Sequence, residues 1–393
     1  MRARFLIAAC LLVLAACDQD AEEQIKTPDP VPDTGARYAP VAVTNLPGWS
    51  TDNLAQALLA WRGSCAKILN HPPTREMGPA AGTAADWRAV CTAITALPDG
   101  DGAGLRALLE SGFGALQVSG GADTGGLFTG YFEPILDATR EKSETHHEPI
   151  YGLPDDHVTV RLGKFDPALK GKSVTGRVEG GQLIPYQKRG EIDAGAITEN
   201  AKVLFWAADP LDVFILQVQG SGIAELPDGT RQRIGFAGHN GHAYGSLGRW
   251  LIAEKELPAN RAAWEDIRGW LESNPDRARA ALAVNPRFIF FRELDGGGPL
   301  GAAGVPLTAE RSLAVDTRHV PLNVPVWLDI EHPDGETRLQ RLMLAQDVGS
   351  AIKGVVRGDF YWGTGRAALD KAGRMKSRGT YYMLVPKTLL PAS

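Results

Sequence analysis

The stretch from Arg341 to Gly365, RLMLAQDVGSAIKGVVRGDFYWGTG, constrains the fold most, because it sets two carboxylates beside apolar runs and among glycines. Residues 342–345 predict a buried strand, and the small residues after Asp347 end it, so this carboxylate falls at a strand end. Asp359 lies between a glycine and a β-prone Phe-Tyr-Trp run. A carboxylate flanked by aromatic side chains and little water has a raised pKa and can donate a proton near neutral pH. The same residues also fit a turn in which the Asp caps backbone N–H groups.

A third acid, Asp316, follows the apolar run from Ser312 to Val315, which predicts a short strand in the same β region. Three carboxylates at strand edges of one domain can converge and raise one another's pKa, unless Arg318 or Lys353 compensates. The alternative for Asp316 is a salt bridge or a turn cap, which would support the site without acting in it.

The first 16 residues have the layout of a secretory signal peptide, with two arginines, then an apolar run, then small residues. The run is too short to cross a bilayer as a permanent helix. It ends in Leu-Ala-Ala before Cys17, which resembles the bacterial lipobox, so we expect residues 1–16 to be removed and Cys17 to be acylated and to anchor the chain to a membrane. Residues 17–45 are polar and rich in proline, which predicts a flexible tether. We therefore expect the chain to lie on the periplasmic face of the cell envelope. Asp18, the residue after the predicted lipidated cysteine, resembles a retention signal and favours the inner membrane over the outer one.

The composition limits the partners and the redox state. The net charge is −5 and there is no Lys/Arg cluster, which argues against nucleic-acid binding. About 375 residues would remain after processing, and 44% hydrophobic composition can bury the cores of two domains. Only Cys65 and Cys91 remain for an oxidising compartment, so we predict a disulfide between them, with two separate buried thiols as the alternative.

The order of predicted elements gives a mainly β fold with helices, of the α+β class. Helical patterns cover residues 52–69, 84–97 and 104–116, and from residue 127 short β-type runs continue to Gly222. Residues 241–285 are helical again, and β structure runs from Phe288 to Val385. This order predicts a β domain inserted into a host domain that both ends of the chain build. We place the helical part of the host at 46–131, the insert at 132–290 and the second part of the host at 291–393.

Two further motifs carry less weight. His239 and His242 have an H-x-x-H spacing, but metal-binding pairs on a helix use i and i+4 and a third ligand is needed, so we predict no metal site. Residues 296–301 satisfy G-x-G-x-x-G, but a proline interrupts the motif and extended structure follows, so we predict a loop and no dinucleotide cofactor.

Several stretches resemble a known family. AVDTRHVPLNVPVW, AQDVGSAIKG and RGDFYWGTG look like the three-aspartate module of the membrane-bound lytic transglycosylase A family. GYFEP, PIYGLP, VQGSG and AGHNGHAYGSLG resemble the insert of that family and its exit, in order, so that the resemblance covers roughly residues 120–385. It implies a double-psi β-barrel domain, an inserted second β domain and a substrate groove between them. It also implies a catalytic acid at Asp359, with Asp347 beside it.

Enzymes of that family cleave the β-1,4 bond between N-acetylmuramic acid and N-acetylglucosamine in peptidoglycan and form a 1,6-anhydro ring without consuming water. The resemblance therefore implies a lytic transglycosylase of cell-wall turnover, with glycan strands as partner and no cofactor or metal. Because the C6 hydroxyl of the sugar is the nucleophile, one acid can suffice. We expect Asp359 to protonate the glycosidic oxygen and then to accept the C6 hydroxyl proton, while Asp347 holds that proton in place or steadies positive charge at C1.

Substrate contacts are assigned more loosely. We expect Tyr131, Tyr361 and Trp362 to contact sugar rings. Thr129, Gln219 and Ser221 would supply polar contacts, and for each such residue a place in the core or in a turn is the alternative.

Other functions remain open from the residues alone. A non-catalytic glycan-binding envelope lipoprotein related to expansins would not need Asp359. An aspartic peptidase would need two equivalent D-[ST]-G loops, whereas the second acid here lies in G-D-F. A purely structural envelope lipoprotein gives no reason to place acids among glycines and aromatics.

Overall fold

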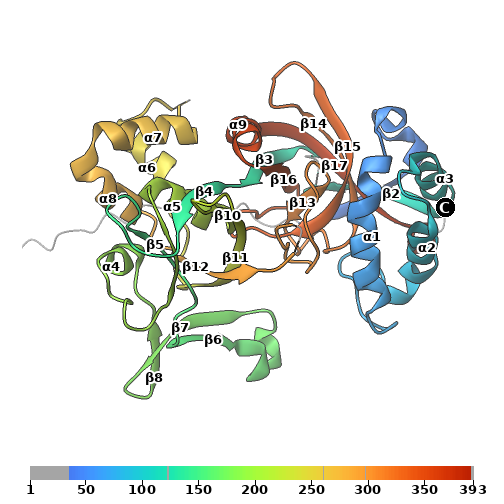
Figure 1. Cartoon of the computed structure of the whole chain (residues 1–393). Coiled ribbons are helices and arrows are strands. Elements are labelled where there is room, and N and C mark those ends of the chain that lie inside the picture. Colours follow the sequence, from blue (N-terminus) through green and yellow to red (C-terminus); the bar gives the residue numbers. More distant parts are fainter. Residues whose placement is uncertain (1–34, 122–123, 260, 297, 391–393) are drawn as a thin grey trace, which may run out of the picture. The chain divides into compact units, whose positions relative to one another are not determined.

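The computed structural model describes residues 35–121, 124–259, 261–296 and 298–390. The predicted signal peptide, the lipidation site Cys17, Asp18 and the first part of the tether lie outside the described residues. The described part of the chain has a mixed α+β fold with three sheets (Figure 1). Within it, no helix has both the length and the apolar character that a membrane crossing requires.

The largest sheet has eight strands in the order β1-β2-β17-β14-β15-β13-β16-β3. Strand β17 also pairs with β3, which is the last strand in this order. Chain segments from before and after the middle third of the sequence therefore lie in one sheet. The strands are β1 (Arg37–Val41), β2 (Phe113–Ser119), β3 (Gly126–Glu133), β13 (Ser312–Val315), β14 (Pro325–Glu331), β15 (Arg338–Asp347), β16 (Arg357–Thr364) and β17 (Lys376–Pro386).

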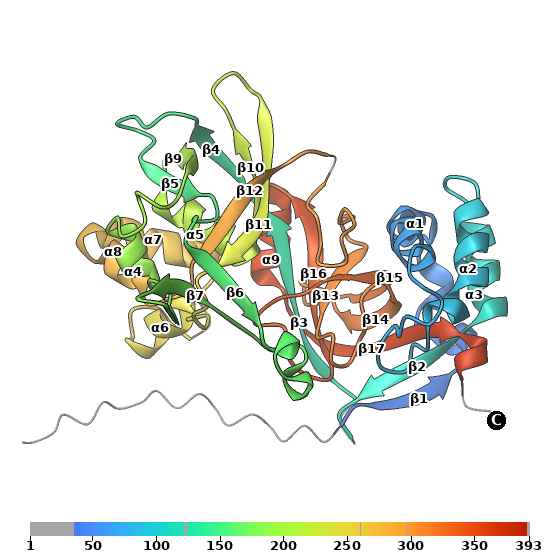
Figure 2. The same cartoon turned by 90° about the horizontal axis from the view of Figure 1, so that it is seen from below.

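Three helices pack together beside this sheet, namely α1 (Ala55–Leu69), α2 (Ala84–Ala96) and α3 (Gly102–Gly112), and both views of the molecule show them near β2 (Figures 1 and 2). Cys65 of α1 and Cys91 of α2 form the predicted disulfide, with their Cα atoms 5.1 Å apart and both side chains fully buried. The third helix ends earlier than predicted, because residues from Phe113 onward continue as strand β2.

A buried ion pair ties the segment before α1 to the sheet. Arg311, which precedes β13, donates through both terminal nitrogens to the two oxygens of Asp52 at 2.8 Å each. Asp52 also accepts the backbone N–H of Leu342 in β15 at 2.9 Å. Both charged side chains are almost completely buried, so their charges are satisfied by each other and by backbone groups.

The second sheet has six strands in the order β12-β11-β10-β4-β9-β5. Only Pro134 separates the end of β3, in the first sheet, from the start of β4, in the second. The strands are β4 (Ile135–Thr139), β5 (Glu148–Tyr151), β9 (Val203–Ala207), β10 (Ser221–Glu225), β11 (Arg231–His239) and β12 (Ile289–Leu294). A third sheet contains β6 (His157–Arg161), β7 (Ser173–Glu179) and β8 (Gln182–Pro185).

The remaining helices are α4 (Arg189–Asp193), α5 (Pro210–Gln219), α6 (Leu247–Ala253), α7 (Trp264–Ser273), α8 (Pro275–Ala283) and α9 (Arg366–Arg374). Helix α5 corrects the sequence analysis, which included this segment in the β region. Asp209 caps its first turn by accepting the N–H of Leu211, and Gly220 ends it with a φ of 83°. Six of the ten residues of α5 are buried, so no polar face reveals the helical period.

Candidate active site

The two predicted acids meet across a single strand. Ala314 of β13 is paired with Asp359 on one neighbouring strand and with Asp347 on the other. Directly paired residues project to the same face of a sheet, so both carboxyl groups point to one face on either side of a methyl group. Asp359 lies within β16, and Asp347 is the last residue of β15, as predicted.

A β-bulge aims Asp347 toward this face. The register shifts between Leu313 and Ala314, so that Gln346 is the extra residue of β15. The Gln346 side chain is buried away from the site and contacts Ser312 and the carbonyl of Ala60. Without the extra residue, the alternation of side chains would place Asp347 on the opposite face of the sheet from Asp359.

Asp359 accepts a hydrogen bond through Oδ1 from the hydroxyl of Thr129 on β3, at 2.5 Å. The guanidinium of Arg357 donates to the same hydroxyl at 2.8 Å and to the carbonyls of Leu127 and Gly358. Burial raises the pKa of Asp359 to about 6, the Thr129 hydrogen bond and the Arg357 charge oppose this rise, and the nearby Asp347 adds to it. The carboxyl group is therefore about half protonated near pH 6, and a minority of molecules carry the proton at pH 7.

Asp347 is held by three donors. Its Oδ1 accepts the N–H groups of Ala302 and Val348 at 3.0 and 2.9 Å, and its Oδ2 accepts the Tyr131 hydroxyl at 3.1 Å. Burial raises its pKa, and these hydrogen bonds oppose the rise. A Cβ atom at Gly301 would lie 2.4 Å from the carbonyl oxygen of Gln346, so a glycine here lets the loop approach Asp347. The glycine-rich loop that contains Gly301 thus helps to hold Asp347 in place.

Asp316 does not join the other two acids. Its carboxylate pairs with Arg318 and accepts the N–H of Gly354 at 2.9 Å. Hydrogen bonds from these groups and the Arg318 charge outweigh burial and lower the pKa of Asp316 to about 2. The three carboxylates therefore do not converge, and Asp316 instead holds the turn around Gly354, which agrees with a supporting place.

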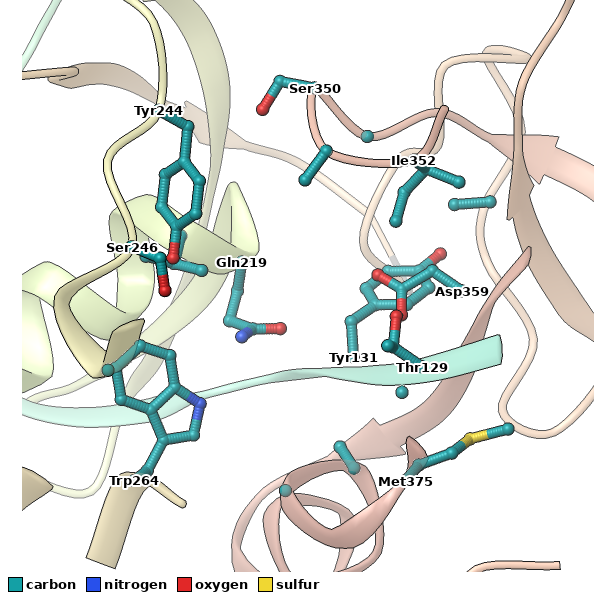
Figure 3. Close-up of a pocket in the computed structure, with 18 of the residues that line it drawn as sticks. Thr129, Tyr131, Gln219, Tyr244, Ser246, Trp264, Ser350, Ile352, Asp359 and Met375 are labelled. Carbon is teal, nitrogen blue, oxygen red and sulfur yellow. The ribbon is translucent and has the colours of Figure 1, made fainter. Parts of the chain in front are cut away.

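Asp359 and Asp347 line a hollow of about 450 Å³. In Figure 3, Thr129, Tyr131 and Asp359 face Gln219, with Tyr244 and Trp264 farther across the hollow. A second hollow of about 610 Å³ shares Gln219, Tyr244 and residues 347–350 with the first. The two hollows therefore form one groove that passes Asp347, with Asp359 in its first part.

The predicted substrate residues fall into three groups. Thr129, Tyr131 and Gln219 line the first hollow, and Gln219 with Ser221 lines the second. Tyr361 is buried behind Tyr131, with the two ring centroids 5.2 Å apart. It therefore supports the wall of the hollow.

Trp362 points away from the site. Successive residues of a strand face opposite sides, so Trp362 lies on the other face of β16 from Asp359 and Tyr361. It is 5% exposed, its indole N–H donates to the sulfur of Met375 at 3.3 Å, and it lines neither of the two hollows among the described residues. The structure thus places it in the core beside α9.

Some lining residues were not selected from the sequence. Arg357 lies two residues before Asp359 in β16. Residues at this spacing in a strand face the same side, and this was the sequence signal that could have placed Arg357 at the site. Tyr244 and Ser246 belong to AGHNGHAYGSLG, whose resemblance to the family exit was noted without assigning them a contact. Trp264 begins α7, and no local pattern marks it as a groove residue.

The two histidines of the H-x-x-H motif make structural hydrogen bonds. His239 accepts the N–H of Gly241 at 2.9 Å, and burial lowers its pKa to about 4. His242 Nε2 lies 2.8 Å from the carbonyl oxygen of Tyr186. In the described ranges no group of three or more His, Cys, Asp or Glu side chains has an arrangement that could hold a metal ion.

A carboxyl group with a raised pKa, a second carboxyl held beside it and an open groove together define an acid–base enzyme that takes an extended substrate. Comparison with known families agrees with this class. The model of the MltA specific insert domain matches residues 127–292, and the model of the 3D domain matches residues 311–385. Membrane-bound lytic murein transglycosylase A of Escherichia coli K12 is 31% identical over 291 residues, which cover 72% of each chain. This chain belongs to the membrane-bound lytic murein transglycosylase A family.

Solved structures share the fold. The monoclinic crystal structure of MltA from Neisseria gonorrhoeae has a TM-score of 0.79 and 33% sequence identity, covering 91% of this chain and 94% of that one. The crystal structure of Escherichia coli MltA with bound chitohexaose has a TM-score of 0.64 and 26% identity, covering 91% and 93%. The mixed α+β architecture is thus that of the family.

Proposed function

We propose that this chain is a peptidoglycan lytic transglycosylase that cleaves the β-1,4 bond between N-acetylmuramic acid and N-acetylglucosamine and leaves a 1,6-anhydro end, in cell-wall turnover. The observation that carries the proposal is the Asp359 carboxyl, which lies in a groove with a raised pKa and accepts a hydrogen bond from Thr129. The relatives' names and the chitohexaose bound to the Escherichia coli protein support a glycan substrate.

In the proposed reaction, protonated Asp359 donates its proton to the glycosidic oxygen as the bond from that oxygen to C1 breaks. The resulting carboxylate then accepts the proton of the C6 hydroxyl as its oxygen bonds to C1, which returns Asp359 to its protonated form. No water enters the balance, because the nucleophile belongs to the substrate and is held beside C1. Protonation by a positioned acid accounts for about 10²- to 10⁴-fold of the rate.

Asp347 would act on this reaction without exchanging a proton with the substrate. Two backbone N–H groups and the Tyr131 hydroxyl hold it, so its charge is placed to raise the pKa of Asp359 and to steady positive charge that develops at C1. Thr129, Tyr131, Gln219 and Ser221 would contact the glycan from the groove walls, with Asp316 and Lys353 in support.

We further propose that the host domain is a double-psi β-barrel built from residues 46–131 and 291–393, and that residues 132–290 form the inserted domain across the groove. Pairing of β17 with both β14 and β3 supports closure of the strands into a barrel. The match of the insert model to residues 127–292 supports the division, although β3, which that match includes, pairs within the first sheet.

The chain would reach its substrate from a membrane. We propose that Cys17 is lipidated and anchors the protein on the periplasmic face of the envelope, with Asp18 favouring the inner membrane. The relatives are named membrane-bound, which supports an anchor of some kind.

The test is a digest of peptide-bearing peptidoglycan by the purified protein and by Asp359→Asn, followed by mass spectrometry of the sugar ends. We expect 1,6-anhydro-N-acetylmuramic ends with the wild type and none with the variant, which should still bind the glycan. Reducing ends would instead show a hydrolase, with water activated by a second carboxylate. Binding without cleavage by the wild type would show a non-catalytic glycan-binding lipoprotein.

A further inference from the structure

The second hollow of the groove is rich in positive charge. Besides residues that it shares with the first, it is lined by the four cationic side chains Arg189, Arg287, Arg292 and Lys353. We refer to this space of about 610 Å³ as the basic hollow. Its one lining carboxylate is Asp347, which already accepts three hydrogen bonds from the protein. A chain with a net charge of −5 therefore gathers unbalanced positive charge at one end of its groove.

None of the four cations has an ion-pair partner in the part of the chain that the structure describes. Arg189 is 3% exposed and donates to the carbonyls of Asn285 and Arg287 and to the side chain of Gln217. Arg287 donates to the carbonyl of His242 at 2.9 Å. The charge of Asp193 partly compensates Arg189, whereas burial lowers the pKa of Arg287 and the carbonyl group that accepts from Arg287 carries no net charge.

The other two cations stand at the rim. Arg292 and Lys353 are exposed, on β12 and on the loop after β15. The residue after Arg292 behaves differently, since Glu293 pairs with Arg140 through two hydrogen bonds. Arg231 and Arg233 on the neighbouring strand β11 also have carboxylate partners. Unpaired cations are thus a property of this hollow and not of the sheet that borders it.

The cations do not match the uncharged part of the substrate. Sugar rings with N-acetyl groups carry no charge, and aromatic or hydrogen-bonding side chains suffice to bind them. The anionic groups of peptidoglycan are the carboxylates of its peptide stems, which hang from the lactyl group of alternate sugars. Phe236 and Leu300, 47% and 45% exposed, line the same hollow and would meet the methyl groups of alanine residues in such a stem.

We propose that the basic hollow binds the carboxylates of a peptide stem on the glycan strand that Asp359 cleaves. The proposal rests on the proposed function and adds a specificity site to it. The basic hollow shares Gln219, Tyr244 and residues 347–350 with the hollow that contains Asp359, so a stem bound there belongs to a sugar close to the cleaved bond. Arg292 and Lys353 meet the carboxylates at the rim, and the buried Arg189 and Arg287 add to the positive potential beneath.

The test compares two substrates, one with and one without the stems. Peptide-bearing glycan strands are compared with the same strands after an amidase has removed the peptides, which leaves only a lactyl carboxylate on each N-acetylmuramic acid. Both are given to the full-length protein in detergent, and kcat and KM are measured. We expect the wild type to have a KM roughly tenfold lower on peptide-bearing strands, an advantage that weakens as salt rises. The double variant Arg292→Gln/Lys353→Gln should lose most of this advantage, because its KM should rise far more on peptide-bearing strands than on stripped strands.

A matched control is Arg161→Gln/Lys170→Gln, which removes two exposed cations that line neither hollow. It should behave as the wild type on both substrates. Equal KM values of the wild type on the two substrates would overturn the proposal, as would an equal loss by the Arg292/Lys353 variant on both. Thermal unfolding of each variant checks that the fold is intact.

A binding measurement separates this proposal from the proposed function. The dissociation constants of both strand types for Asp359→Asn are measured without turnover. Tighter binding of peptide-bearing strands, lost with Arg292→Gln/Lys353→Gln in the same background, supports the stem site even if the wild type yields no 1,6-anhydro ends. Indistinguishable dissociation constants would refute the stem site even if those ends appear.

Discussion

The hydroxyl of Thr129 donates a hydrogen bond of 2.5 Å to Asp359, across 230 positions of sequence. The same hydroxyl accepts from Arg357, so its proton is directed at the carboxylate. This hydrogen bond stabilises the charged form of Asp359 and opposes the burial that raises its pKa. The protonation of the proposed acid thus depends on a residue of a different strand.

We predict that Thr129→Val shifts the pH profile of kcat/KM. Asp359 must be protonated to donate, so activity should fall as the pH rises through about 6. Valine has the same shape but cannot donate, so the carboxylate loses stabilisation and the falling limb should move up by about one pH unit.

The matched control for this prediction is Thr159→Val. The Thr159 hydroxyl lies 3.2 Å from that of Thr175 at an exposed position outside the groove. Its profile should superimpose on that of the wild type. A falling limb of Thr129→Val that stays in place, or moves to lower pH, would contradict the assignment of this limb to Asp359.

A second prediction concerns the stability of Asp359→Asn. The folded protein raises the pKa of this carboxyl from 3.8 to about 6, so folding favours its protonated form. Stability from this group is present below pH 4 and is lost as the pH rises toward 6. At pH 7.5 the variant should therefore be more stable than the wild type by about 2 kcal/mol, since each pKa unit corresponds to roughly 1.4 kcal/mol and partial exposure reduces the total.

Urea denaturation at pH 7.5 and pH 3.5 measures this difference, which should nearly vanish at the lower pH. Asp316→Asn is the contrasting control, because the pKa of Asp316 is lowered to about 2. Its carboxylate stabilises the fold above pH 4, and that stability is lost as the pH falls through 2, so this variant should be less stable at pH 7.5. Equal effects of the two substitutions would refute the opposite shifts.

The buried pair of Asp52 and Arg311 should be important for folding. Asp52→Ala leaves the Arg311 guanidinium, 1% exposed, without a counter-charge and frees the N–H of Leu342. We expect a loss of about 3–5 kcal/mol in the free energy of unfolding. Glu225→Ala, which breaks an exposed pair with Arg231, should cost about 0–1 kcal/mol. Denaturation of both variants in urea decides the matter, and similar losses would argue against the buried pair.

The disulfide between Cys65 and Cys91 should add about 3 kcal/mol, because it closes a loop with a sequence separation of 26. Thermal unfolding of Cys65→Ala/Cys91→Ala should show a melting temperature several degrees lower, and a reducing agent should not lower it further. Neither cysteine lines the groove, so kcat at 25 °C should remain that of the wild type. A large fall in kcat with unchanged stability would contradict a purely structural bond.

The local patterns predicted most of the elements and the strand positions of Asp347 and Asp359. Both groove acids, the strand before Asp347 and the helices on either side of the β region follow from apolar period and turn residues. Helix α5 could not be predicted in this way, because it is buried on most sides and therefore lacks the alternation of apolar and polar faces that marks a helix. The caps Asp209 and Gly220 were the remaining signal, and they were visible in the sequence.

Orientation was harder to predict than position. The bulge at Gln346, which brings Asp347 to the face of Asp359, depends on pairing with β13 and has no local signature. Trp362 was expected in the groove because it follows Asp359 closely, but its odd spacing from that residue places it on the opposite face. Arg357 donates to the Thr129 hydroxyl, which in turn donates to Asp359. This chain of hydrogen bonds requires β3 and β16 to be neighbours, which the sequence does not reveal directly.

The pairing of β17 with β3 has a consequence for the order in which the chain is made. Residues 376–386 are synthesised after every other strand of the first sheet, yet they hold β3 on one side and β14 on the other. Until these residues are synthesised, strand β3, which carries Thr129, has β16 beside it but lacks its second neighbour, β17. Asp359 is synthesised only shortly before them. A nascent chain therefore lacks the strand that joins β3 to β14 until the rest of the first sheet has been made. The first sheet, and with it the support of the strand that carries Thr129, would thus be completed only when its last-made strand is in place.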